Sequence, residues 1–223
     1  MKILGGLPGC LTAFPALLFF FLFVHAALDI SLEMIDRIER EYGTAAGDRI
    51  QNWQHVMTSS KGLLEEEKLQ VVNDFFNHLK FVEDIKNWGV DDYWATPFEF
   101  LAKNGGDCED FAIAKYFTLV EIGVPEDKLR ITYVKAMKYN QTHMVLTYFP
   151  SPQATPLVLD NLNPQILSAS ERTDLVPVYS FNGTGLWLAK SLGSGKPVGN
   201  SDRLNLWQDL KARMQSMIKG TKN

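Results

Sequence analysis

The first part of the chain carries hydrophobic residues at helical spacing. Between residues 31 and 80, two apolar stripes recur at intervals of three or four positions. The first stripe consists of Leu32, Ile35 and Ile38, and the second of Leu69, Val72, Phe75, Phe76 and Leu79. This pattern predicts amphipathic helices whose apolar faces lie in the core.

The middle of the chain predicts loops followed by one buried helix. Residues 82–104 are rich in Trp, Asp and Pro and predict loops with a short helix at 97–101. Gly105-Gly106 predicts an abrupt turn. From 107 to 122 the helical period returns, and it stops at Gly123-Val124-Pro125.

The last part of the chain changes to strand-like runs and ends in another helix. The predicted strands are 130–136, 143–149, 157–159, 175–181 and 186–188, and the predicted helix is 202–218. Helices that come first, followed by strands without regular alternation, predict an α+β domain. We therefore expect N-terminal helices packed on an antiparallel sheet.

The N-terminus has the pattern of an export signal. Lys2 precedes an apolar run at 11–24, and small residues follow around Ala26. This predicts a signal peptide at 1–26, cleaved after Ala26, with residues 27–223 as the mature domain. An uncleaved membrane anchor is the alternative, because the apolar run can be extended beyond residue 24. Either interpretation places the domain outside the cytoplasm, and after cleavage it is not embedded in the membrane.

The charge balance excludes one class of partner. Lys and Arg total 22 against 26 Asp and Glu, which gives a net charge of -4, and 46% of the residues are hydrophobic. Such a composition is typical of a globular domain and excludes a disordered chain. Binding to a nucleic-acid backbone requires a basic surface, so we expect no nucleic-acid partner.

Cys108 is the candidate nucleophile. Removal of the leader takes Cys10 with it and leaves Cys108 as the single thiol, at the start of a predicted helix, where the helix dipole stabilises a thiolate. His143 opens one predicted strand and Asp160 follows the next, so adjacent strands can supply a base and a carboxylate that orients it. A buried, inert cysteine and a turn role for Asp160 are the alternatives.

Two carboxylates flank the thiol and oppose its ionisation. Asp107 and Glu109 raise the pKa of a neighbouring cysteine unless their charge is neutralised. A divalent cation such as Ca²⁺ neutralises carboxylates, and Asp91 and Asp92 lie in a loop that can add ligands. Alternatively, Asp107 and Asp110 cap the helix. The spacing does not match an EF-hand, so the residues alone leave both interpretations open.

Four segments together resemble the bacterial transglutaminase-like cysteine proteinases. They are Gly-Asp-Cys-Glu-Asp-Phe-Ala-Ile-Ala-Lys-Tyr at 106–116, Gly-Val-Pro at 123–125, Thr-His at 142–143 and Leu-Asp at 159–160. The resemblance covers most of the mature chain. It implies a papain-like or transglutaminase-like core with Cys108 as nucleophile, His143 as general base and Asp160 as its orienter. It also implies that Asp107 and Glu109 bind calcium.

The resemblance further implies a substrate, a compartment and a regulator. The expected enzyme is a calcium-dependent periplasmic endopeptidase that cuts the N-terminal region of a large surface adhesin at a paired-alanine site, so that the biofilm disperses. The expected inhibitor is the periplasmic domain of an inner-membrane receptor that binds cyclic di-GMP in the cytosol.

Two other functions are compatible with the same residues. One is a protein-glutamine acyltransferase with the same triad, and the other is a non-catalytic binding module braced by calcium. The backbone amide of Cys108 can supply one oxyanion donor. A second donor stays unassigned, because Trp88 and Trp94 can equally be packing residues.

Overall fold

The computed structural model describes residues 30–188 and 195–219, so the predicted signal peptide and Cys10 lie outside the described residues. Three helices come first: α1 (Leu32–Tyr42), α2 (Thr44–Ser60) and α3 (Glu65–Asn77). The second apolar stripe packs in or against the core, as predicted. The prediction is wrong for Leu32, which is 78% exposed. Ser31 caps α1, and the buried face begins one turn later at Met34.

Two short helices occur between residues 82 and 104, and the second confirms the short helix predicted at 97–101, whereas the first was not foreseen. They are α4 (Asp84–Asn87) and α5 (Pro97–Lys103). Thr96 and Glu99 form a capping box at the start of α5, with Pro97 in the first turn. The helix ends at Asn104, which adopts the left-handed conformation with φ 59°. Local capping signals therefore set both ends of α5.

The glycine pair forms a strand, where the sequence predicted a turn. The strand β2 (Gly105–Gly106) pairs in parallel with β1 (Lys80–Phe81). A Cβ atom at Gly105 would lie 2.4 Å from the carbonyl oxygen of Lys80, so only glycine allows this close approach. The pairing holds the segment that leads into the next helix.

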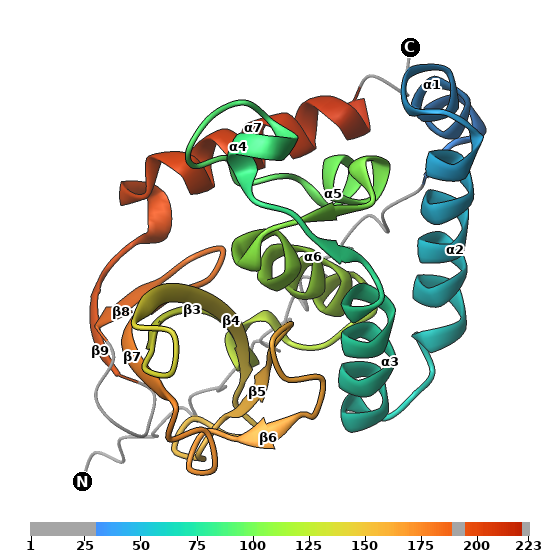
Figure 1. Cartoon of the computed structure of the whole chain (residues 1–223). Helices are drawn as coiled ribbons and strands as arrows, with labels where there is room; N and C mark the ends of the chain where they lie inside the picture. Colours follow the sequence, from blue (N-terminus) through green and yellow to red (C-terminus); the bar gives the residue numbers. More distant parts are fainter. Residues whose placement is uncertain (1–29, 189–194, 220–223) are drawn as a thin grey trace, which may run out of the picture.

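That helix is α6 (Cys108–Glu121), and most of its residues are buried. It contacts β4 of the main sheet, α3 and α5. Figure 1 shows α6 at the centre of the molecule, between the sheet and the N-terminal helices. The start of α6, Cys108, is therefore held by the core itself.

The sheet has seven strands in the order β6-β5-β4-β3-β7-β8-β9, and every pair is antiparallel. The strands are β3 (Leu129–Ala136), β4 (Gln141–Tyr148), β5 (Leu157–Leu159), β6 (Leu167–Ser168), β7 (Leu175–Phe181), β8 (Leu186–Leu188) and β9 (Lys196–Gly199). Short 3-10 helices occur at Glu126–Lys128 and Ser201–Arg203. The predicted strands are confirmed, whereas β6 and β9 were not foreseen.

The C-terminal helix α7 (Asn205–Lys219) crosses the molecule (Figure 1), and its Arg213 contacts Glu99 of α5 and the carbonyl of Trp94. Trp207 is fully buried and packs against Tyr116, Phe117 and Phe181, so it joins α7 to α6 and to the sheet. Within 30–188 and 195–219, no helix is long and apolar enough to cross a membrane. Helices packed on an antiparallel sheet confirm the predicted α+β class.

Candidate active site

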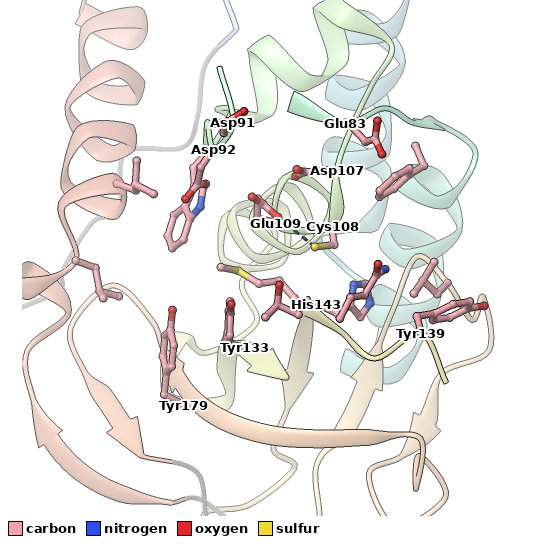
Figure 2. A pocket seen from close by; sticks show the side chains of 18 of the residues that line it. Glu83, Asp91, Asp92, Asp107, Cys108, Glu109, Tyr133, Tyr139, His143 and Tyr179 are labelled. Atoms are coloured by element: carbon pink, nitrogen blue, oxygen red, sulfur yellow. Dashed lines mark hydrogen bonds between the residues drawn. The ribbon is translucent and has the colours of Figure 1, made fainter. Parts of the chain in front are cut away.

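Cys108 lies at the first position of α6 and faces a cavity of about 940 Å³. His143 lines the same cavity, and Figure 2 shows both side chains among the residues that line it. Cys108 is partly exposed and forms no disulfide. The structure therefore brings the predicted nucleophile and the predicted base into one accessible site.

His143 and Asp160 are joined by a hydrogen bond. Imidazole Nε2 and carboxylate Oδ1 are 2.7 Å apart, and the two residues are 2% and 1% exposed. His143 is the third residue of β4, and Asp160 directly follows β5, which pairs with β4. Because Nε2 is engaged, Nδ1 is the ring nitrogen that is left to face the cavity.

Arg172 holds the other oxygen of the Asp160 carboxylate, and sequence reasoning missed it. Arg172 Nη2 donates to Asp160 Oδ2 at 2.7 Å, while Leu162 N donates to Oδ1 at 3.0 Å. Burial alone raises the pKa of Asp160, but the contacts with His143, Leu162 and Arg172 outweigh it and lower the pKa to about 2. The carboxylate is therefore ionised and fixed in orientation.

The thiol is surrounded by charges that disfavour a thiolate. Burial raises the pKa of Cys108 well above its usual value, and Glu109 and Asp107 raise it further. The thiol donates to Glu109 Oε2 at 3.1 Å. The backbone of Met144 acts in the opposite direction and lowers the pKa. The thiol is thus protonated unless a positive charge offsets these carboxylates.

The carboxylates beside the thiol form two groups with the spacing of a cation site. One is Asp84, Asp92 and Glu109, and the other is Asp84, Asp107 and Asp110; within each group the oxygens lie within 4.8 Å of one another. Asp84, which belongs to both, was not foreseen, because it lies far upstream of Cys108 in the sequence. Asp91 is exposed and belongs to neither group.

Three buried oxygens in these groups have no hydrogen-bond partner. They are Asp84 Oδ1, Asp107 Oδ1 and Asp110 Oδ2. Burial together with Glu109 raises the pKa of Asp107 to about 10, and burial opposed by the Tyr93 amide raises the pKa of Asp84 to about 6. Hard oxygen ligands without partners fit a cation such as Ca²⁺.

The capping alternative explains less of this geometry. Asp107 is the N-cap residue of α6, but its side chain makes no capping hydrogen bond. Asp110 Oδ1 accepts from the backbone amide of Ala95 at 2.7 Å, so it fixes the preceding loop instead. The two tryptophans differ: Trp94 lines the cavity, whereas Trp88 packs against Tyr93.

Comparison with known proteins identifies close relatives. A family model described as bacterial transglutaminase-like cysteine proteinase matches residues 46–187. The structure of Legionella pneumophila LapG is 46% identical with a TM-score of 0.72, covering 83% of this chain and 98% of that chain.

Two further LapG structures from the same organism agree with this match. The EGTA-treated form is 47% identical with a TM-score of 0.74 and covers 83% of this chain and 98% of that chain. The calcium-bound form is 46% identical with a TM-score of 0.71, and the match covers 83% of this chain and 99% of that chain. No curated protein matches the chain.

Proposed function

The chain belongs to the bacterial transglutaminase-like cysteine proteinases of the LapG type, and from this premise we propose that it hydrolyses peptide bonds with a triad of Cys108, His143 and Asp160. The observation that carries the assignment is the buried His143–Asp160 hydrogen bond in the cavity that also contains Cys108. Nucleophile, base and orienting carboxylate are the parts that thiol hydrolysis requires.

In the proposed reaction, His143 takes the thiol proton as Cys108 Sγ attacks the scissile carbonyl carbon. His143 then gives that proton to the leaving amine as the C–N bond breaks and a thioester forms. A water molecule, deprotonated by His143, attacks the thioester and releases the acid and the thiol. The backbone amide of Cys108, at the start of α6, donates to the developing oxyanion.

We propose that the carboxylates of Asp84, Asp92, Asp107, Glu109 and Asp110 hold Ca²⁺. The calcium-bound structure of Legionella pneumophila LapG and the three unpartnered buried oxygens support this proposal. Bound calcium supplies positive charge beside the thiol, which favours its ionised form. Calcium held by Glu109 would offset the charge of the carboxylate to which the Cys108 thiol donates.

We propose, from the family resemblance, that the substrate is the N-terminal region of a large surface adhesin, cut at a paired-alanine site in the periplasm. Release of the adhesin disperses the biofilm. The proposed regulator is a cyclic di-GMP-responsive receptor of the inner membrane, whose periplasmic domain sequesters the protease. The predicted signal peptide at 1–26 supports the periplasmic location.

The test is cleavage of an adhesin N-terminal fragment by the mature domain, with calcium or with EGTA, beside Cys108→Ala. We expect cleavage only by the unmodified enzyme with calcium. Cleavage by Cys108→Ala contradicts the nucleophile assignment, and cleavage in EGTA contradicts the calcium requirement. Mass spectrometry with an added amine distinguishes hydrolysis from acyl transfer, because the transferred amine changes the product mass.

A further inference from the structure

Four large apolar side chains that line the catalytic cavity are exposed, and the least exposed of them is Leu206 on α7, at 37%. The other three, Phe81, Tyr139 and Leu162, are 55%, 52% and 44% exposed. Single exposed apolar residues are common, but four around one catalytic cavity indicate a surface that contacts an apolar ligand. We call Phe81, Tyr139 and Leu162 the apolar rim.

Two members of the rim are tied to the catalytic machinery through their backbone. Phe81 pairs with Gly106 in the parallel β1–β2 pair, two residues before the nucleophile. Leu162 donates its amide hydrogen to Asp160 Oδ1 at 3.0 Å. The backbones of both residues are therefore held at fixed positions relative to the reacting groups.

The third member, Tyr139, lies in the turn between β3 and β4. The turn ends at Asn140 in a left-handed conformation with φ 50°, and β4 then leads to His143. In Figure 2, Tyr139 lies on one side of His143, and Tyr133 and Tyr179 lie on the other side. The cavity thus has two aromatic ends with the imidazole between them.

The chemistry of the proposed reaction distinguishes these two ends. His143 protonates the leaving nitrogen, so the part of the substrate that follows the scissile bond must extend from the imidazole. The acyl part stays bonded to Cys108 until water releases it. Two members of the rim lie next to the His143–Asp160 pair, because the Leu162 amide donates to Asp160 and Tyr139 lies beside His143 (Figure 2).

We propose that the apolar rim binds an apolar side chain in the substrate segment that follows the scissile bond. This inference rests on the peptidase activity proposed above and adds a specificity to it. An enzyme whose rim is filled before the bond breaks selects substrates at the acylation step, because the leaving segment contacts the rim only up to that point.

The test is a competition between adhesin fragments. Two fragments differ only in carrying Leu or Ser at the second residue after the cleaved bond, and a second pair carries the same exchange at the second residue before it. Each pair is digested in one tube, and mass spectrometry gives the ratio of kcat/KM values. Because the ratio is internal, partial unfolding of an enzyme variant does not change it.

We expect the unmodified enzyme to prefer Leu after the bond by about tenfold. Tyr139→Ser and Leu162→Ser should each reduce this preference to less than about threefold and leave the ratio before the bond unchanged. Leu64→Ser is the matched control, because Leu64 is 74% exposed and does not line the cavity.

Two other outcomes separate a failure of the rim assignment from a failure of the proposed function. If the unmodified enzyme shows no preference after the bond, or if the rim variants change the ratio only before it, the rim assignment is overturned while the cleavage itself supports the peptidase function. If the unmodified enzyme cleaves neither fragment in calcium, the proposed function fails and the rim assignment fails with it.

Discussion

Arg172 is the residue with the most important contacts in the site among those that the sequence did not predict. Its guanidinium is 4% exposed and bridges Asp160 and Asp174, with donor–acceptor distances of 2.7 and 2.9 Å. A buried ion pair is costly to break from one side, because the remaining charge stays in a medium that solvates it poorly. The orientation of Asp160, and through it of His143, depends on this cation.

Replacement of Arg172 should therefore destabilise the fold. We expect Arg172→Met to lower the free energy of unfolding by about 3–5 kcal/mol, because it leaves Asp160 buried and without its cation. Urea unfolding followed by tryptophan fluorescence measures the change. Arg203→Met is the control, since Arg203 is exposed. A loss of less than about 1 kcal/mol would show that the pair is not important for stability.

Asp160 should also make the free energy of unfolding depend on pH. Its pKa is lowered to about 2 in the fold, so its contribution is full above about pH 4 and is lost as the pH falls toward 2. The shift corresponds to about 2 kcal/mol. We expect the difference in unfolding free energy between the unmodified protein and Asp160→Asn to shrink over this range. A difference that stays constant from pH 5 to pH 2 would contradict the lowered pKa.

At the scale of elements, long periodic segments were predictable and very short ones were not. The helix at 107–122 and the strands at 130–136 and 175–181 follow from hydrophobic periodicity, which operates within a single segment. A two-residue strand such as β2 has no period, so the sequence Gly105-Gly106 alone predicts a turn. Its pairing depends on β1, which lies far away in the sequence.

The same distinction explains the candidate site. Cys108, His143 and Asp160 could be chosen from residue type and from strand order, because adjacent strands place neighbouring ends together. Asp84 and Arg172 could not be chosen in this way. No local sequence pattern shows that tertiary packing brings Asp84 to the carboxylates beside Cys108, or Arg172 to Asp160. Long-range contacts of this kind are available only from the fold.

The β1–β2 pair should be sensitive to a single methyl group. We expect Gly105→Ala to lower the free energy of unfolding by about 1–3 kcal/mol and to reduce cleavage, because the new Cβ would overlap the Lys80 carbonyl and displace the segment before Cys108. Thermal unfolding and a cleavage assay measure both effects. The control is Gly62→Ala, since no atom lies within 4 Å of a Cβ built there. Equal stability of the two variants would argue against the close approach.

At the scale of the whole molecule, the proposed cation site joins three parts of the chain. Its carboxylates come from α4, from the loop before α5 and from the start of α6. An ion bound there cross-links these segments in the native state only, so it should stabilise the fold as a whole.

Calcium should therefore raise the melting temperature, and the increase should depend on Asp84. We expect millimolar CaCl₂ to raise the Tm relative to EGTA, and Asp84→Asn to remove most of this increase. Asp91→Asn is the matched control, because Asp91 is exposed and outside both carboxylate groups. Equal calcium effects in the two variants would contradict the proposed ligand set, and isothermal titration calorimetry provides an independent affinity.

The position of Cys108 on α6 has a consequence for how such an enzyme can be controlled. The helix that presents the thiol is also the centre of the core, in contact with the sheet, α3 and α5. To displace the sulfur, a regulator would have to repack most of the interior, which costs far more than a protein contact provides. A protein inhibitor is therefore expected to act at the entrance: it would cover the cavity mouth and leave an intact catalytic centre that is ready as soon as the inhibitor dissociates.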